Sequence, residues 1–380
     1  MKIAFDAQPM AGKRTGIGNY TLHLIKALDG NYPAEEYYGI INSFRKRAVF
    51  PAGLLPGDMK FLYTRVPNII PGHLSAGLRY GFLIGHECSR AGIDLFHGTD
   101  FNLPVNFKGI KIVTVHDLSF LVHPEFFTAA ILSHLKNIGR NLLMADRIIA
   151  VSHNTAHDIA AFFPSVKDKV VAVYSGINPF FLENISRIPS EIPSAVPIIP
   201  HGKYILYSGT IEPRKNLINL IAAYDIAAEK IEHRLVITGK NGWMCEDVFR
   251  RHDRSKFKER IIFTGYLDDD TLRSLFRGAD MFVYPSFYEG FGFPVVEAQA
   301  SQIPVITSPN SSLLEVGKDS VIYADPTSPE DLACKIIELA NNPEQKKRLV
   351  TAGLENIKRF NWAKTAEEVM EIYLKCFKKP

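Results

Sequence analysis

The sequence has little of what marks secreted, metal-binding or membrane-spanning proteins. Only four cysteines occur in 380 residues, and Cys88, Cys245, Cys334 and Cys376 form no CxxC pair and no metal-ligand spacing. We therefore expect reduced thiols rather than a disulfide framework or a zinc site. No apolar run reaches the roughly 18 residues of a membrane-spanning helix, and the start, MKIAFDAQPM, is typical of a first strand rather than a signal peptide. These absences favour a cytoplasmic protein.

Neither positive nor negative charge is in large excess. The formal net charge is +4, and residues 1–190 hold 19 Lys and Arg against 14 Asp and Glu. A basic first half would suit an anionic membrane surface or an anionic acceptor, or it reflects scatter over a solvated surface. No basic stripe with interleaved aromatic residues occurs, which argues against a nucleic-acid partner.

What is present is an alternation of short apolar strands and amphipathic helices. In the first half, strands are predicted at 2–7, 94–99, 111–117 and 147–152, with helical spacing between them. Buried strands that alternate with helices predict a parallel sheet covered on both faces. The length suits two such domains.

A proline-rich stretch, RIPSEIPSAVPIIPHG (187–202), interrupts the alternation and is the best candidate for a linker. The alternation restarts at YILYSGT (204–210) and continues to a closing helix. We therefore predict two doubly wound, Rossmann-like α/β domains that face each other across a cleft. Their predicted ranges are 1–186 and 203–361, and 362–380 forms a helix that returns to the first domain.

The stretch EGFGFPVVE (289–297) fits neither a helix face nor an alternating strand. It follows a strand predicted at 281–286, and Pro294 suits the first turn of a helix, so it lies at the carboxyl edge of a sheet. Gly290 and Gly292 permit a close approach of a ligand to the backbone. The N–H groups of Phe291, Gly292 and Phe293 could then hold a diphosphate at the helix N-terminus.

Two glutamates flank this loop. Taken alone, Glu297 would merely complement the positive end of the helix, and Glu289 would be an ordinary surface acid. Placed beside a phosphate cradle, both carboxylates could instead bind the hydroxyl groups of a nucleotide sugar.

The motif Glu-Gly-Phe-Gly-x-Pro-x-x-Glu-Ala resembles the paired-glutamate motif of glycosyltransferase family 4, which are retaining, group 1 enzymes of the GT-B fold. Further stretches that resemble the family follow in order along the chain: RTGIGNYTLHLIKAL (14–28), TVHDLSF (114–120), ADRIIAVS (145–152), YSGTIEPRKNLINLIAAY (207–224), GKNGW (239–243), FTGYLDDDTLRSLFRGAD (263–280) and FNWAKTAEEVMEIY (360–373). Within the family, FDAQPMAGKRTGIGNYT is most similar to bacterial polysaccharide mannosyltransferases.

The resemblance implies a role for each matching position. Glu289 would face the transferred sugar, Glu297 would bind the ribose, and His116 would contact the sugar or stabilise the transition state. The remaining implied positions are the donor-phosphate residues Arg214, Lys215, Gly16, Gly18, Phe291, Gly292 and Phe293, and the nucleotide-base region Gly239, Lys240, Gly265 and Tyr266. His97 and His123 are interpreted as structural.

Three features of the sequence bear on how closely its phosphate and metal chemistry follows that of the family. Thr210 stands where the family often has an arginine, so a phosphate contact is missing or is supplied by Arg214. GIGNY (16–20) lacks the third glycine of a dinucleotide-binding motif, because Thr21 occupies that position. The run Asp268–Asp270 precedes a helical pattern, which favours helix capping over a catalytic metal site.

The expected function is therefore a metal-independent, retaining hexosyltransferase without a cofactor. It would use a GDP- or UDP-sugar, with GDP-mannose suggested by the similarity to mannosyltransferases. The acceptor would be a saccharide or lipid-linked acceptor of O-antigen or capsule assembly, met in peripheral contact with the inner membrane. One alternative is a nucleotide-sugar epimerase or sugar-phosphate synthase of the same fold, and another is an inactive sugar-binding scaffold.

Overall fold

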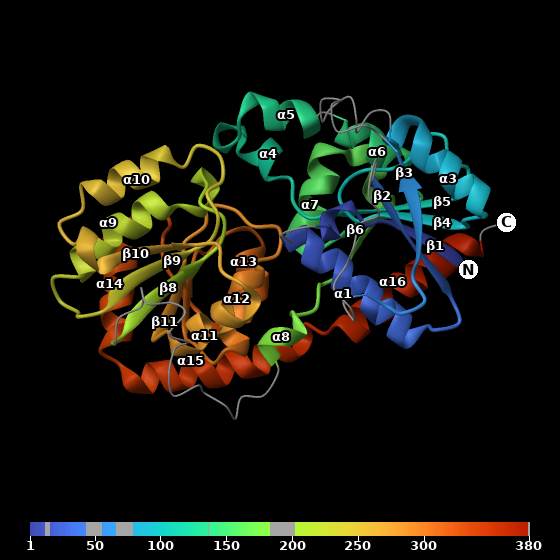
Figure 1. Ribbon diagram of the computed structural model, residues 1–380. Helices are drawn as coiled ribbons and strands as arrows, with labels where there is room; N and C mark the ends of the chain where they lie inside the picture. The colour runs from blue at the N-terminus through green and yellow to red at the C-terminus, as the bar shows by residue number, and fades with distance from the viewer. Residues whose placement is uncertain (12–15, 43–54, 66–78, 136, 183–201, 379–380) are drawn as a thin grey trace. The chain divides into compact units, whose positions relative to one another are not determined.

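The computed structural model describes residues 1–11, 16–42, 55–65, 79–135, 137–182 and 202–378 (Figure 1). The predicted linker, 187–202, lies outside the described residues except for Gly202. Contacts divide the chain into two compact units. The first contains Met1–Leu118, Ala130–Gly176 and Phe360–Pro380, and the second contains Ser119–Ala129 and Ile177–Arg359.

The sheet of the first unit is wholly parallel, in the order β3-β2-β1-β4-β5-β6-β7. Its strands are nearly continuous apolar runs, as a sheet covered on both faces requires. The order reverses between β1 and β4, which opens a crevice at the carboxyl ends of these two strands. The strands are β1 (Lys2–Asp6), β2 (Glu36–Asn42), β3 (Lys60–Thr64), β4 (Leu95–Gly98), β5 (Ile110–Val115), β6 (Arg147–Ala150) and β7 (Val170–Ala172).

The sheet of the second unit repeats this design with the parallel order β10-β9-β8-β11-β12-β13. Here the order reverses between β8 and β11, so the loops that follow these strands meet. The two Rossmann-like sheets expected from the sequence are thus confirmed. The strands are β8 (Tyr204–Ser208), β9 (Arg234–Thr238), β10 (Ile261–Gly265), β11 (Met281–Tyr284), β12 (Val305–Thr307) and β13 (Ile322–Tyr323).

Helices lie on both faces of each sheet (Figure 1). In the described residues no helix combines the length and the apolar character needed to cross a membrane. The helices are α1 (Gly16–Asn31), α3 (Ile84–Ala91), α4 (Ser119–Val122), α5 (Ala129–Leu135), α6 (Ile138–Met144), α7 (His153–Phe162), α8 (Pro179–Leu182), α9 (Leu217–Ala227), α10 (Glu246–Asp253), α11 (Asp269–Gly278), α12 (Phe293–Ala300), α13 (Ser311–Gly317), α14 (Pro329–Ala340), α15 (Pro343–Asn356) and α16 (Trp362–Phe377).

Side-chain caps define several helix starts. The Asp268 carboxylate accepts a hydrogen bond from the Thr271 N–H and begins α11, so the capping interpretation of the Asp268–Asp270 run is confirmed. Ser328 and Asn342 cap α14 and α15 in the same way, each before a proline in the first turn. These short-range signals explain why the helices of the second unit are readable from the sequence.

The C-terminal helix α16 packs on the first unit, against α1 and the sheet. A buried chain of hydrogen bonds fixes it there: Tyr373 Oη lies 2.5 Å from His97 Nδ1, and His97 Nε2 lies 2.7 Å from Thr114 Oγ1. Burial lowers the pKa of His97 to about 3, so this imidazole is neutral and purely structural. At Gly176 any Cβ would lie 2.4 Å from the Trp362 ring, so the approach of the helix requires glycine there.

Candidate active site

The site of the second unit lies where the strand order reverses. The loop Gly209–Glu212 and a short 3₁₀ turn, Pro213–Lys215, follow β8, and the loop 285–292 follows β11. Loops at such a switch point are where open α/β sheets bind ligands. The sequence motifs at 207–224 and 289–297 are therefore brought together by the topology of one sheet.

The glycine-rich loop turns directly into a helix. Gly292 is the N-cap of α12 with φ of +98°, a conformation that favours glycine, and Pro294 lies in the first turn. This confirms the predicted strand-to-helix turn. The structure places the backbone of Gly292 and Phe293 at the positive end of α12, where an anion would be stabilised. A bound phosphate at Phe291, Gly292 and Phe293 stays a prediction.

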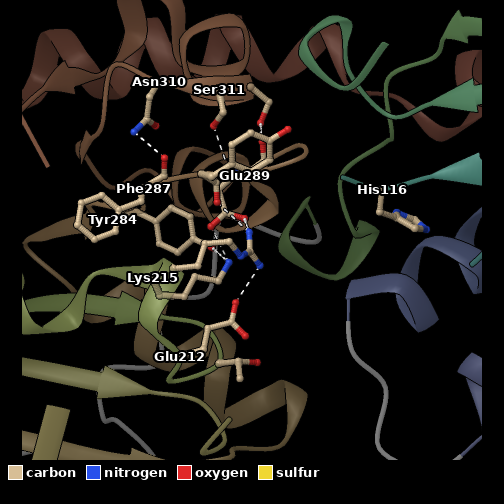
Figure 2. A network of polar contacts seen from close by, with 12 residues as sticks. His116, Glu212, Lys215, Tyr284, Phe287, Glu289, Asn310 and Ser311 are labelled. Atoms are coloured by element: carbon tan, nitrogen blue, oxygen red, sulfur yellow. Dashed lines mark hydrogen bonds and ion pairs between the residues drawn. The ribbon is translucent and has the colours of Figure 1, made fainter. Parts of the chain in front are cut away.

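Glu289 is the centre of a buried ion-pair cluster (Figure 2). Its Oε1 lies 2.6 Å from Lys215 Nζ, and its Oε2 lies 3.0 Å from Arg214 Nη1. Lys215 Nζ also donates to Tyr284 Oη at 2.7 Å, and Arg214 Nη2 donates to Glu212 Oε1 at 2.9 Å. Glu289 is thus no ordinary surface acid, and Arg214 places a guanidinium beside Lys215 although position 210 is threonine.

Glu289 is ionised at neutral pH. Burial raises the pKa of Glu289, but the charges of Lys215 and Arg214 outweigh burial and hold this pKa at about 2. Burial and the neighbouring guanidinium lower the pKa of Lys215, against the opposite effect of Glu289 and Glu212. Because the pKa of Glu289 is depressed, the stability that its ionised form contributes is present above the ordinary carboxyl range and is lost as the pH falls toward 2.

A second segment, the start of α13 and its N-cap Asn310, holds the main chain around Glu289 (Figure 2). Asn310 Nδ2 donates to the Phe287 carbonyl at 2.9 Å, and the Glu289 N–H donates to Ser311 Oγ at 2.9 Å. Ser312 Oγ donates to the Glu289 carbonyl at 2.9 Å. Ser311 adopts φ of +45°, which is rare for a residue other than glycine. These residues were not predicted from the sequence, in which the polar run SPNSS (308–312) is their only signal.

We expect Ser312→Ala to lower the free energy of unfolding by about 1 kcal/mol, because one buried hydrogen bond to the Glu289 carbonyl is lost. Chemical denaturation measures this change. Ser274→Ala on α11, whose hydroxyl donates to the Asp270 carbonyl within the helix, is the matched control and should change stability by less. An equal loss of stability in both variants would show that the Ser312 hydrogen bond to the Glu289 carbonyl contributes nothing specific.

Glu297 lies in a different environment, on α12 one turn from its start. It is half-buried, and among the residues described no hydrogen-bond or ion-pair partner is seen for its carboxylate. Burial, aided by the negative charge of Asp269, raises its pKa to about 7. The two glutamates of the motif therefore differ: Glu289 is fully paired and ionised, whereas Glu297 has a carboxylate available to a ligand.

The residues expected at the nucleotide base follow β9 and β10. Gly239 has φ of +142°, and a Cβ there would lie 1.9 Å from the Gly209 carbonyl oxygen. Its N–H donates to the Gly265 carbonyl at 3.0 Å, and the Lys240 carbonyl accepts from the Ile211 N–H at 2.9 Å. The loops after β8, β9 and β10 are thus in contact, and Tyr266 at the end of β10 exposes 47% of its surface. Base binding by these residues stays a prediction.

In the first unit, His116 directly follows β5. Its Nε2 lies 2.7 Å from the Thr99 carbonyl oxygen, and its ring meets the Tyr20 ring edge-on at 4.9 Å. Since a carbonyl only accepts, Nε2 carries the proton and Nδ1 is an acceptor. Burial lowers the pKa of His116, so the ring is neutral.

Gly16 and Gly18, two further positions implied at the donor phosphates, lie at the start of a helix. Gly16 is the first residue of α1 and Gly18 is buried within its first turn. A phosphate contact by either glycine stays a prediction. Tyr20, one turn further along α1, is buried and its hydroxyl lies 3.2 Å from Thr114 Oγ1 of β5. Residues 12–15, which begin this motif, lie outside the described residues.

Comparisons with known proteins agree with this geometry. Residues 190–356 match the family model described as glycosyl transferases group 1. The chain is 28% identical to the O-antigen chain mannosyltransferase B of Escherichia coli, over 98% of this chain and 99% of that protein.

Two solved structures share the fold over nearly the whole chain. Sucrose-phosphate synthase of Thermosynechococcus elongatus superposes with a TM-score of 0.81 at 18% identity, covering 99% of each chain. The Anabaena protein HepE, solved with UDP and glucose, gives a TM-score of 0.71 at 15% identity, covering 99% of this chain and 100% of that one. Residues 190–356, which hold Lys215, Glu289 and Glu297, thus match the glycosyl transferases of group 1, and the chain is a glycosyltransferase.

Proposed function

We propose that this glycosyltransferase moves a hexose, with retention of configuration, from a nucleoside diphosphate sugar to a hydroxyl group of a saccharide acceptor. The observation that carries the proposal is the cluster in which Lys215 and Arg214 bind the two oxygens of Glu289 at the switch point of the second sheet. A pair of buried cations next to the start of α12 is suited to a diphosphate.

The chemistry follows from where charge develops. The bond between the anomeric carbon and the β-phosphate oxygen breaks, and its electron pair leaves with the nucleoside diphosphate. The acceptor oxygen forms the new bond to that carbon, and its proton passes to the departing phosphate. Lys215, Arg214 and the N-terminus of α12 stabilise the growing negative charge, which is the largest catalytic contribution that fixed dipoles and cations make. Glu289, held in place by both cations, offers its carboxylate to the electron-deficient sugar.

Two further groups complete the proposal. The unpaired Glu297 carboxylate accepts hydrogen bonds from the ribose hydroxyls, the role implied by its place in the motif. Neutral His116 has its Nδ1 lone pair available as an acceptor for a hydroxyl of the sugar. No step in this scheme requires a metal ion or a cofactor.

The sugar is proposed to be mannose and the donor GDP-mannose. This is supported by the relative over the full length of the chain, whose name describes an O-antigen chain mannosyltransferase. The acceptor would then be a growing, lipid-linked saccharide of a cell-surface polysaccharide.

We also propose peripheral contact with an anionic membrane surface, where such an acceptor would be met. The basic excess of residues 1–190 supports it, as do two exposed apolar side chains of the first unit, Leu143 at 58% and Phe162 at 44% exposure. Sedimentation with anionic vesicles, but not with zwitterionic ones, is the expected result, and Leu143→Glu should reduce it.

The proposed function is tested by a thermal-shift screen of GDP, UDP, ADP and their sugars, followed by product analysis with labelled donor. A ligand at a hundredfold excess over its Kd stabilises the folded state by about 2.7 kcal/mol. We expect stabilisation by GDP and GDP-mannose and label in an acceptor saccharide. Label in an isomerised donor without acceptor would instead identify an epimerase, and label in a sugar phosphate would identify a synthase. If the protein neither transfers nor hydrolyses any nucleotide sugar, it is a binding scaffold.

A further inference from the structure

Glu212 is a buried carboxylate in the proposed phosphate site that the scheme above does not use. It exposes only 3% of its surface, and its Oε1 accepts from Arg214 Nη2 at 2.9 Å (Figure 2). It lies between the end of β8 and the turn that carries Arg214 and Lys215.

Glu212 is the second of two carboxylates that pair with the Arg214 guanidinium. The Nη1 of this guanidinium already donates to the Tyr288 carbonyl at 2.8 Å and to Glu289 Oε2 at 3.0 Å. Burying a further carboxylate carries a desolvation cost, and a buried ion pair is weak evidence for a role in stability. The pairing of Arg214 with Glu212 therefore calls for another explanation.

Charge supplies that explanation. Lys215 and Arg214 carry two positive charges, and Glu289 and Glu212 carry two negative charges, so the cluster is neutral as a whole. A site that binds a diphosphate would be expected to hold an excess of positive charge. Glu212 offsets part of the positive charge through its ion pair with Arg214.

The amount of positive charge in the site matters most for binding of the product. In the donor, the β-phosphate is esterified to the sugar. After transfer, its bridging oxygen becomes a terminal phosphate oxygen. Once the proton received from the acceptor is released to solvent, the nucleoside diphosphate carries more negative charge than the donor had. A site with excess positive charge would consequently hold the product more tightly than the substrate and would release it slowly.

We infer that Glu212 is a positioning residue that offsets one positive charge of the Arg214–Lys215 pair and thereby lets the nucleoside diphosphate product leave. The inference rests on the proposed function, because it requires that pair to bind the diphosphate. It assigns Glu212 an effect on turnover, acting through Arg214 rather than through contact with the substrate.

The test is product inhibition by GDP, or by UDP if the thermal screen selects it, in Glu212→Gln. This variant keeps the size of the side chain and its hydrogen bond to Arg214 but removes the charge. We expect the product inhibition constant to fall by about tenfold or more, kcat to fall, and the donor KM to fall less than the inhibition constant. Glu212→Asp, which retains the charge, should keep product affinity near that of the parent enzyme.

Controls separate the possible failures. Glu229→Gln, an exposed acid of the second unit, should leave product affinity unchanged. Lys215→Ala should weaken binding of the nucleoside diphosphate product. If it does not, the proposed function of the cluster fails. Suppose that Lys215→Ala weakens product binding while Glu212→Gln leaves product binding unchanged or weakens it too. Then only the inference about Glu212 is overturned, and the proposed function stands. Equal changes in Glu212→Gln and Glu212→Asp would likewise overturn it, because charge would not be the cause.

Discussion

Lys215→Ala is expected to lower kcat/KM for the donor by about a thousandfold, which corresponds to about 4 kcal/mol of transition-state stabilisation. The ammonium group is buried at the switch point, 2.6 Å from Glu289 Oε1, and it is placed to meet negative charge that grows on the leaving diphosphate. Because that charge is larger in the transition state than in the donor, kcat should fall more than KM rises. Steady-state kinetics with varied donor measures both.

The same substitution should also affect stability. Removing one partner of a buried ion pair leaves the other poorly compensated, at a cost of about 3 kcal/mol. Without Lys215, the carboxylate of Glu289 keeps only Arg214, so its pKa should rise from about 2 and acid unfolding should begin at a higher pH. Denaturation curves at pH 7 and pH 4 detect this.

Lys230→Ala, at an exposed lysine of the same unit, is the matched control for both measurements and should behave like the parent enzyme. If Lys215→Ala transferred sugar at the parental rate while folded, Lys215 would have no part in the chemistry, and the cluster would be purely structural.

The second prediction concerns Glu297 and has a characteristic dependence on pH. Its pKa of about 7 means that burial favours the protonated form in the free enzyme, so the stability it contributes is present at low pH and is lost as the pH rises toward 7. Ribose hydroxyls that donate to the ionised carboxylate should reverse this preference. Donor binding should therefore release about half a proton at pH 7, and donor affinity should fall about tenfold between pH 8 and pH 6.

Calorimetry in buffers of different ionisation enthalpy measures the released proton. A nucleotide sugar is the right ligand, since its diphosphate is a diester that does not titrate in this range. Glu297→Gln should abolish the proton release and raise the donor KM by about 10- to 100-fold with little change in kcat, because ribose contacts are made equally in the ground and transition states. Proton release that persists in Glu297→Gln would assign the linkage to another group, such as Asp100, whose pKa burial raises to about 6. An unchanged donor affinity would contradict the ribose assignment.

The sequence predicted most of the fold because the relevant signals are local. Continuous apolar strands, the helix cap at Asp268 and the proline at position 294 each act within a few residues, and all of them appear in the structure as expected. The motif order then identified the group 1 glycosyltransferases, which the family model confirms for 190–356. The narrower assignment to family 4 remains an expectation.

What the sequence did not reveal depends on contacts between distant positions. The pairing of Glu289 with Lys215 joins residues 74 positions apart, and the clamp by Ser311 and Ser312 brings in a third loop. No periodicity encodes such contacts, so the burial of Glu289, its depressed pKa and the role of Glu212 became visible only in three dimensions.

The position of α16 has a consequence for how the protein is made. A chain emerging from the ribosome folds its N-terminal part first where that part is self-sufficient. Here the first sheet needs Tyr373 to meet His97 and Trp362 to pack on Gly176, so its core is incomplete until nearly the whole chain has been synthesised. The second unit, which lies earlier in the chain than α16, can finish folding sooner. A chain truncated before residue 362 should therefore fail to fold in its first unit, although the truncation lies far along the sequence from most of that unit.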